Sequence, residues 1–403
     1  MACELPDATE RAQCSVVVLG AGYAGLRAAL GLARQPGLTV TVVDRERTPA
    51  VKTRLHELRA SVPAVDIESI LESTNVRFVQ GDVSEVDLED KRVRVGRSWL
   101  PYSHLIVAIG SRASDLGVSG VRSHAIMLDG AAESARLAKA VSQLEQKGGS
   151  LVVVGGGPTG VEAAAEASRR LGRGRVSVLE AGRRILPSLP TLPSLYAESV
   201  LAWLGVRVRA SAQVDRVEAR RLFLRDGQAV EYDVLLWSAG VEAHPLLASA
   251  GLASPGCQAD VDEFLVSSVD RDVYVVGDCA AVGDGGPSAQ LAVQQGDFAA
   301  ADLLRRFRGK VRRPYRAEVL GQFVSLGCDA AGAVQLGPVR IPLVGPLARA
   351  AKGAGEARHR VLVAARTTRA RFGLARLVAC EMAPLDRPNR PWSCASRPPT
   401  IRA

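Results

Sequence analysis

The feature that most constrains this chain is a unit of strand, glycine-rich turn and helix that occurs twice. Residues 15–29 read SVVVLGAGYAGLRAA, and residues 151–166 read LVVVGGGPTGVEAAAE. In each copy an apolar run leads into three glycines at G-x-G-x-x-G spacing, and an alanine-rich helical pattern follows. Such units favour parallel strands joined by crossover helices. We therefore expect an α/β fold in which one such unit is inserted into another.

The three glycines of each turn have separate tasks in binding a dinucleotide. The first makes a tight turn, the second lets the backbone approach a pyrophosphate, and the third lets the helix pack on the strand. The phosphates meet the helix N-terminus, where free N–H groups and the dipole favour negative charge. An acid should follow to bind the ribose. Asp44 lies 19 residues after Gly25, and Glu180 lies 20 residues after Gly160.

Glu180 also bears on the choice between NADH and NADPH. A carboxylate at this position binds two ribose hydroxyls and repels a 2′-phosphate, which favours NADH. Arg183 and Arg184 follow closely and can weaken that preference, so NADPH stays open as an alternative.

Charge and cysteine usage narrow the class of protein. Residues 340–403 hold 13 Lys and Arg against 3 Asp and Glu, so the net charge of +9 belongs to the C-terminal region. Such a tail can meet an anionic membrane surface or nucleic acid, or can keep a protein soluble. We expect loose membrane contact at most and no nucleic-acid partner. The seven cysteines include no C-x-x-C or C-x-x-x-x-C pair, which argues against a disulfide framework and a metal site and favours the cytoplasm.

Strand and helix patterns predict five segments. Residues 1–115 and 243–308 would form one domain, with residues 116–242 inserted as a second nucleotide-binding domain. Residues 309–383 would form a C-terminal α+β segment that meets the acceptor, another subunit or a membrane, and residues 384–403 a disordered tail. No apolar stretch is long enough to span a membrane.

The whole arrangement resembles the flavoprotein family with two Rossmann-like dinucleotide-binding domains, in which one site keeps FAD and the other binds NAD(P)H. The resemblance covers roughly residues 14–300, and Gly277-Asp278 is similar to the family's second FAD fingerprint, although a strand-end aspartate can also simply cap a helix. The family would place these residues at FAD: Gly20, Gly22, Tyr23, Ala24, Gly25, Asp44, Arg45, Val83, Ala108, Gly110, Gly277, Asp278, Gln290, Leu291 and Ala292. It would place these at NADH: Gly155, Gly157, Pro158, Thr159, Gly160, Glu180 and Gly240.

Within that family, the segment 287–296, PSAQLAVQQG, resembles the signature of type II NADH dehydrogenases, the non-pumping NADH:quinone oxidoreductases. Gln290 and Gln294 would share one helix face, and the resemblance places them at a quinone. The alternative is a helix that only supports FAD. The resemblance also places Glu166 near the nicotinamide, although acids are favoured near any helix start. His56 could relay a proton or be structural.

With no cysteine between residues 14 and 257, electrons must leave the flavin directly. The expected function is hydride transfer from NADH to FAD and electron transfer to a quinone-like small molecule. A reductase of a protein carrier such as ferredoxin or rubredoxin, and a scaffold that senses NADH without turnover, stay open as alternatives. Residues 358–379 carry arginines without a clean apolar face, which is poor evidence for membrane insertion. A peripheral position on the inner membrane face and a homodimer are further expectations.

Overall fold

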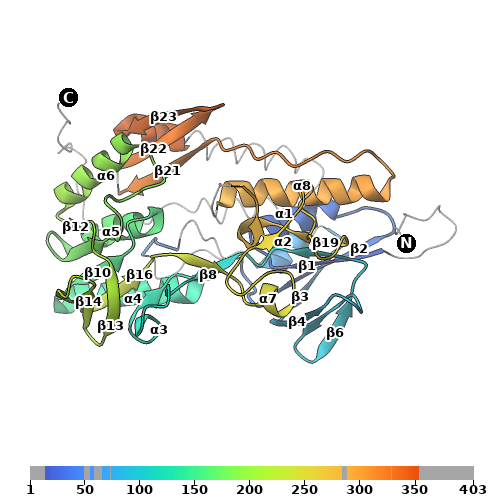
Figure 1. The fold of residues 1–403 in the computed structure, drawn as a ribbon, viewed down its shortest axis with the longest axis horizontal. Coiled ribbons are helices and arrows are strands. Elements are labelled where there is room, and N and C mark those ends of the chain that lie inside the picture. Colours follow the sequence, from blue (N-terminus) through green and yellow to red (C-terminus); the bar gives the residue numbers. More distant parts are fainter. Residues whose placement is uncertain are drawn as a thin grey trace.

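The computed structural model describes residues 14–49, 55–58, 66–72, 74–283, 288–327 and 329–353. Figure 1 shows two lobes side by side, with a smaller antiparallel sheet above the left-hand lobe. Each lobe is built on one parallel sheet, which confirms the expected α/β class. The arginine-rich stretch 358–379 and the proline-rich end lie outside the described residues.

The first sheet has five parallel strands in the order β19 (Val273–Val275), β7 (His104–Val107), β1 (Cys14–Leu19), β2 (Leu38–Asp44) and β3 (Val76–Gln80). Alternate side chains of β1 point to opposite faces. Val16 and Val18 pack under α1 (Tyr23–Leu32), α2 (Ile67–Leu71) and α8 (Ala289–Phe307). Val17 and Leu19 pack towards α7 (Leu246–Ser249) and the small sheet of β4 (Val83–Asp87), β5 (Arg92–Val95) and β6 (Ser98–Pro101).

The second sheet repeats this plan. Its parallel strands are β12 (Arg207–Arg209), β11 (Val176–Leu179), β10 (Leu151–Val154), β16 (Val234–Trp237) and β9 (Ile126–Met127). One face is covered by α4 (Ala131–Lys147), α5 (Pro158–Leu171) and α6 (Thr191–Leu204). The other is covered by α3 (Val121–His124) and by β13 (Val214–Glu218), β14 (Arg221–Leu224) and β15 (Ala229–Glu231).

The chain enters and leaves the second lobe through one antiparallel ribbon. β8 (Ser111–Ala113) pairs with β17 (Val241–Ala243). Arg112 and Glu242 form an ion pair across this ribbon, with 2.6 Å between Nη2 and the carboxylate. After the ribbon come β18 (Ala259–Asp260), which pairs with β20 (Ala280–Ala281), and the single turn η2 (Gly277–Cys279). β19 also follows the ribbon in the sequence, and it pairs with β7 at the edge of the first sheet.

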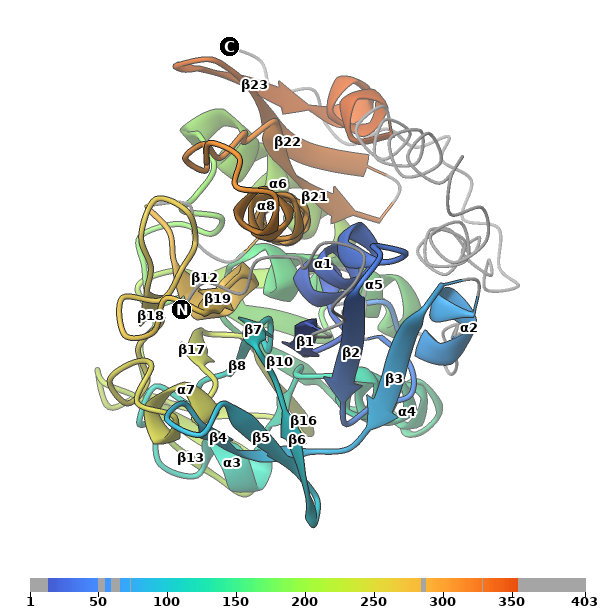
Figure 2. The ribbon, with the colours of Figure 1, turned by 90° about the vertical axis from the view of Figure 1, so that its right-hand side faces the viewer.

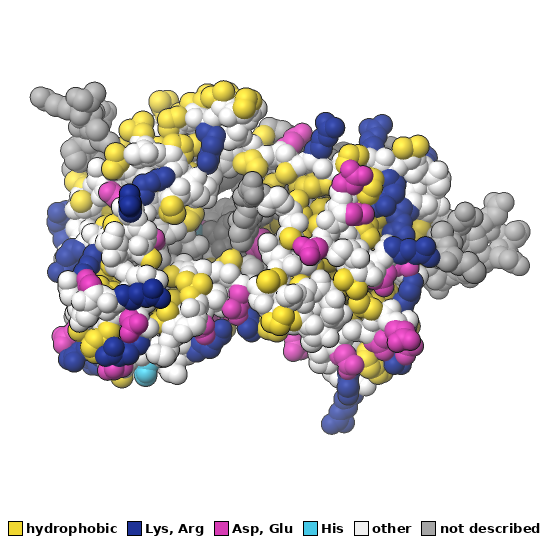
Figure 3. All heavy atoms as spheres, viewed as in Figure 1, with side chains coloured by type: hydrophobic (Ala, Val, Ile, Leu, Met, Phe, Trp, Pro, Cys, Tyr) yellow, Lys and Arg dark blue, Asp and Glu magenta, His cyan; other side chains and the backbone are white. Residues whose placement is uncertain are grey.

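The C-terminal sheet consists of β21 (Gly321–Leu326), β22 (Asp329–Leu336) and β23 (Val339–Val344), and residues 345–353 are helical. Figure 2 shows this sheet above α6 and next to α8. Val324, Leu326 and Ala331 join the core of the second lobe. Figure 3 shows apolar side chains along the outer edge of this sheet, where Leu336 and Val339 are more than half exposed. Among the described residues no helix is both long and apolar enough to span a bilayer.

Candidate active site

The first glycine turn joins β1 to α1 and leaves room for a ligand at only one of its three glycines. Gly20 has a φ of +94°, and a Cβ there would lie 2.5 Å from the carbonyl oxygen of Ala108. A Cβ on Gly25 would lie 1.9 Å from the Gly20 carbonyl oxygen. A Cβ on Gly22 would meet nothing within 4 Å. The first and third glycines are therefore required by the fold, and the second faces the space that a pyrophosphate needs.

Asp44 closes this cradle as the sequence predicts. Its carboxylate accepts hydrogen bonds from the backbone N–H of Ala21, at 2.6 Å, and of Glu46, at 2.9 Å. These contacts fix the acid at the rim of the turn, beside the open space at Gly22. Arg45 is exposed and pairs with Glu46 at 3.8 Å. The Asp44 carbonyl accepts from Gly81 N–H, which brings the segment leading to Val83 to the same rim.

The second cradle has the same internal contacts. Gly155 has a φ of +108°, and a Cβ there would lie 2.7 Å from the backbone of Ser238. A Cβ on Gly160 would lie 2.0 Å from the Gly155 carbonyl oxygen, whereas one on Gly157 would meet nothing within 4 Å. Pro158 occupies the first turn of α5. Its ring costs no hydrogen bond there, because the first N–H groups of a helix have no intrahelical partner.

Glu180 corresponds to Asp44 in this second cradle. Its carboxylate accepts from Gly156 N–H at 2.7 Å and from Gly182 N–H at 2.6 Å. Arg184 is committed elsewhere, because its guanidinium donates to the carbonyl groups of Leu186, Pro187 and Leu189. The acid is thus not neutralised by this arginine, which supports the expected preference for NADH. Arg183 is exposed.

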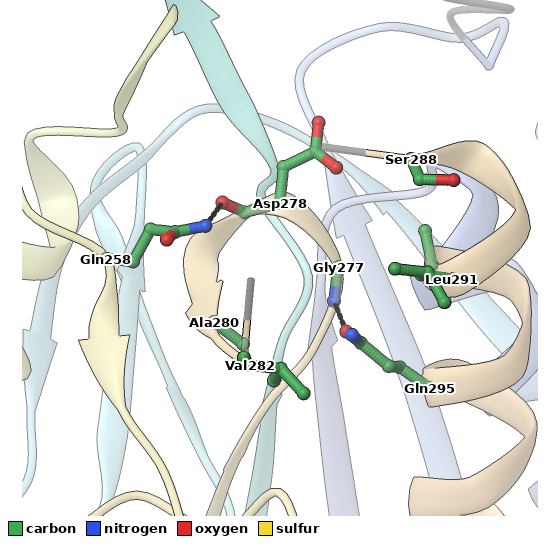
Figure 4. A pocket seen from close by; sticks show the side chains of 10 residues that line it. Gln258, Gly277, Asp278, Ala280, Val282, Ser288, Leu291 and Gln295 are labelled. Atoms are coloured by element: carbon green, nitrogen blue, oxygen red, sulfur yellow. Dashed lines mark hydrogen bonds between the residues drawn. The ribbon is translucent and has the colours of Figure 1, made fainter. Parts of the chain in front are cut away.

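A third element faces the first cradle. Gly277 has a φ of +79° and donates its N–H to Oε1 of Gln295 at 2.6 Å. Asp278 accepts a hydrogen bond from the Ser111 hydroxyl at 3.0 Å, and its carbonyl accepts from Gln258. Figure 4 shows Gln258, Gly277, Asp278 and Gln295 around a cleft, with the Asp278 carboxylate on the same side as Ser288.

The cleft is lined by the η2 turn and by the start of α8, including Leu291 and Ala292, two of the residues expected at FAD. Gly110 and Gly240 take positive φ values just beyond the ends of β7 and β16. Tyr23 and Ala24 open α1, and Thr159 opens α5. The residues expected at each nucleotide therefore gather at the carboxyl ends of the strands in the two parallel sheets, which is where open α/β sheets bind their ligands.

Cys279 is placed beside Asp278 but is not built for redox chemistry. Burial raises the pKa of its thiol to about 11, and the sulfur donates to the carbonyl groups of Val107 and Val276. A thiol with a pKa that high stays protonated at neutral pH and is a poor nucleophile. The other described cysteines outside η2, Cys14 and Cys257, likewise form no disulfide. The described residues hold no group of three metal-ligating side chains.

Gln290 and Gln294 of α8 make contacts that the sequence did not reveal. Gln294 Nε2 donates to the carbonyl of Glu318 at 2.8 Å, and its Oε1 accepts from Glu318 N–H at 3.0 Å. Gln290 Oε1 accepts from Leu320 N–H at 3.3 Å. Gln290 and Gln294 therefore bind backbone of the segment that leads into β21. The Nε2 group of Gln290 makes no hydrogen bond with another described residue.

His56 and Glu166 are not brought together. Glu166 pairs with Arg169 one turn further along α5, at 3.5 Å. His56 instead contacts Glu162, with 3.2 Å between Nδ1 and Oε2, and both side chains are 12% exposed. Glu162 also accepts from Ser325 N–H at 2.9 Å and lies 3.8 Å from Lys352. It thereby joins α5 to three other segments.

Sequence reasoning missed Glu162, Gln295 and Ser111 as site residues. Gln295 is 3% exposed, and its signal was a polar residue on the apolar face that Leu291, Ala292 and Ala299 define on α8. For Glu162 the signal was its i, i+4 relation to Glu166, which did not tell which acid faces inward. Ser111 carried no signal, because its partner Asp278 is 167 residues away.

Fold and cradles together define the class: an enzyme that binds FAD and NADH and catalyses electron transfer. The chain belongs to the pyridine nucleotide-disulphide oxidoreductases, whose family model matches residues 14–296. It is 27% identical over 376 residues to the type II NADH:quinone oxidoreductase of Haemophilus influenzae, covering 77% of this chain and 85% of that one.

Two further proteins are similar over most of the chain. The demethylphylloquinone reductase NdbB of a Synechocystis species is 27% identical over 365 residues, covering 84% of this chain and 90% of its own. The structure of NDH2 from Plasmodium falciparum in complex with NADH superposes with a TM-score of 0.75 at 16% identity, covering 85% of this chain and 94% of its own. At that identity the structural match shows a shared fold.

Proposed function

We propose that this enzyme oxidises NADH and reduces a quinone or a quinone-like small molecule. The observation that carries the proposal is the convergence of the Gly277–Asp278 turn with the start of α8, where Gln290 presents an amide group. The names of the two curated relatives, an NADH:quinone and a demethylphylloquinone reductase, support the choice of acceptor. The net reaction consumes NADH, one proton and the quinone, and yields NAD⁺ and the quinol.

We propose that residues 1–115 and 243–308 hold FAD and residues 116–242 hold NADH. The strand orders support this division, since β19 rejoins β1 and β7 after the whole second sheet has been completed. When bound, FAD supplies the chemistry, because it can accept a hydride and release two electrons. The chain supplies binding and orientation: Gly22 and Gly157 give room to the phosphates, and Asp44 and Glu180 face the riboses.

Near the acceptor, an amide N–H such as that of Gln290 can donate to a quinone carbonyl and stabilise the charge that develops on it. Glu166 and His56 have weaker support as catalytic residues. Glu166 is a third exposed and paired with Arg169, so it would have to leave that partner to approach a nicotinamide. His56 contacts Glu162, and this contact is the structural support for a role as proton donor.

Residues 309–383 would contact the acceptor and, at their outer edge, a membrane surface. Exposed Leu336, Val339 and Ile341 on the C-terminal sheet, followed by the basic C-terminal region, support peripheral contact with the inner face of the cell membrane by a cytoplasmic enzyme. In a homodimer, pairing through β23 is disfavoured because Pro342 interrupts the donors of that edge strand.

The test is anaerobic reduction of the purified holoenzyme. NADH should bleach the flavin absorbance, and menadione should restore it, with NADPH much less effective than NADH. An enzyme that neither coenzyme bleaches would refute the reductase function. A different result would indicate that the acceptor is a protein carrier. In that case menadione would not restore the flavin absorbance, whereas oxidised ferredoxin or rubredoxin would, and this reaction would slow steeply with salt.

A further inference from the structure

The segment 310–320, here called the strap, follows α8 and runs back along it towards the N-terminal end of that helix (Figure 1). It has no regular secondary structure, and it leads directly into β21. Its contacts run in antiparallel order along the helix. Arg312 binds Asp302, Tyr315 stacks edge-on against Phe298, Glu318 binds Gln294 and Leu320 binds Gln290. The strap therefore follows the helix for most of its length.

The far end of the strap is strongly anchored. Asp302 is fully buried and accepts hydrogen bonds from Arg312, with 2.5 Å between Nη2 and Oδ2, and from the hydroxyl of Tyr274 at 2.8 Å. Tyr315 donates its backbone N–H to the carbonyl of Glu263 at 2.7 Å and packs its ring 5.3 Å from that of Phe298. A buried charge bound this closely keeps the strap on α8 at that end.

The near end is held by side-chain amides instead of ions. Gln294 makes the two hydrogen bonds to Glu318 that a neighbouring β-strand would make: its Nε2 donates to the backbone carbonyl, and its Oε1 accepts from the backbone N–H. Both functional groups of this amide are thus used, and a carboxylate or a methyl group cannot replace them. Gln290 uses only its oxygen on the strap.

The near end lies where an apolar acceptor would approach. Val319 and Leu320 are adjacent apolar residues and are 43% and 39% exposed. Gln290 binds the backbone of Leu320 and Gln294 that of Glu318, so Val319 lies between two held residues. These contacts are at the same end of α8 as Leu291, which lines the cleft. An apolar wall with one amide donor suits a flat aromatic ring that carries carbonyl groups.

We propose that Gln294 is a positioning residue, and that it acts by holding the strap so that Val319 and Leu320 form one wall of the acceptor site. Gln294 does not itself touch the acceptor; Gln290 is the glutamine that does. The strap is then a specificity element, since it determines how an apolar acceptor fits at the start of α8. This inference rests on the proposed quinone reductase activity.

The experiment compares three variants of the flavin-loaded enzyme. Gln294→Ala removes the amide, and Glu318→Pro removes the strap's N–H while leaving Gln294 intact. Gln143→Ala, at an exposed glutamine of α4, is the matched control. Three quantities are measured: the rate of flavin bleaching by NADH, kcat and KM for menadione, and hydrogen exchange of the peptide that contains residues 316–321.

Both strap variants should raise the menadione KM about tenfold, as expected for the loss of one or two hydrogen bonds, and should speed exchange in the strap. Bleaching by NADH should match the control in both. A contact of Gln294 with the acceptor predicts instead that Glu318→Pro leaves KM unchanged, and this result would overturn the proposal. So would faster exchange in the strap without any change in KM. A wild-type enzyme that reduces no quinone would refute the proposed function itself. That failure is distinguishable from a failure of the present inference, because it is observed without any variant.

Discussion

Gly157→Ala should separate nucleotide binding from folding at the second cradle. Gly157 has a φ of −72° and a ψ of 179°, values that alanine adopts readily, and its Cβ would meet no protein atom within 4 Å. The substitution should leave the folded chain unstrained. By restricting the unfolded chain, it should even raise the free energy of unfolding by about 0.4–1 kcal/mol.

The affinity for NADH should respond very differently from the stability of the fold. The added methyl group would occupy the space that the pyrophosphate needs at the start of α5, where backbone N–H groups bind phosphate oxygens. Losing one hydrogen bond to a charged group costs about 1.5–3 kcal/mol. At 1.4 kcal/mol for each factor of ten, the Kd of NADH should rise roughly 10- to 150-fold.

The assay is a titration of flavin bleaching with NADH under anaerobic conditions, combined with thermal unfolding of the same samples. Gly22→Ala, whose Cβ also meets no atom within 4 Å, is the matched change at the other cradle and should lower flavin content instead. Gly160→Ala is the contrasting change, because its Cβ would lie 2.0 Å from the Gly155 carbonyl oxygen and should destabilise the fold by about 1–3 kcal/mol. If Gly157→Ala bound NADH as the wild type does, the second cradle would not be the NADH site.

Three further predictions concern charge. Glu180→Gln should lower kcat/KM for NADH and raise it for NADPH, so that their ratio falls at least tenfold, because the amide no longer repels a 2′-phosphate; an unchanged ratio would exclude Glu180 as the selecting residue. Glu162→Gln should lower the free energy of unfolding by about 1–3 kcal/mol, measured by urea denaturation, since a buried carboxylate that binds His56 and Ser325 loses its charge; equal midpoints would make the cluster incidental. Burial lowers the pKa of His104 from 6.5 to about 4, so the unfolded chain binds this proton first and stability should fall as the pH drops from about 6.5 to 4, by at most about 3 kcal/mol; His104→Asn should flatten that decline, and parallel profiles would show that another group causes it.

The cradles could be predicted from sequence because their signals are local. The spacing of Gly20, Gly22 and Gly25 within six residues predicts the turn. The run of buried valines before the turn predicts the strand, and the alanine- and leucine-rich pattern after it predicts the helix. Asp44 could be placed because the acid that binds the ribose follows the glycine turn by about 20 residues, at the end of the second strand. The same spacing located Glu180 just after β11, whereas Asp278 was predicted from its resemblance to the family's second FAD fingerprint.

The contacts of α8 could not be predicted, because their partners carry no side-chain signature. Gln294 binds only backbone of Glu318, and any residue other than proline would offer the same N–H and carbonyl groups. The same holds for Gln290, which binds only the backbone N–H of Leu320. The i, i+4 spacing correctly put both glutamines on one face, but it could not tell whether that face meets a ligand or another part of the chain.

The two cradles have the same internal contacts, so any difference in how long each holds its nucleotide must arise from the elements around them. At the first cradle α8 packs so closely on α1 that a Cβ on Gly296 would lie 2.2 Å from the carbonyl oxygen of Ala24. The same helix carries Gln295, which holds the Gly277 turn in front of the cradle. The first cradle and the Gly277 turn that faces it thus come from segments more than 250 residues apart in sequence, and the packing of α8 on α1 joins them. We therefore expect the first cradle to keep its nucleotide, the proposed flavin, through many turnovers. At the second cradle, the proposed NADH site, α5 packs against β21 instead of α8.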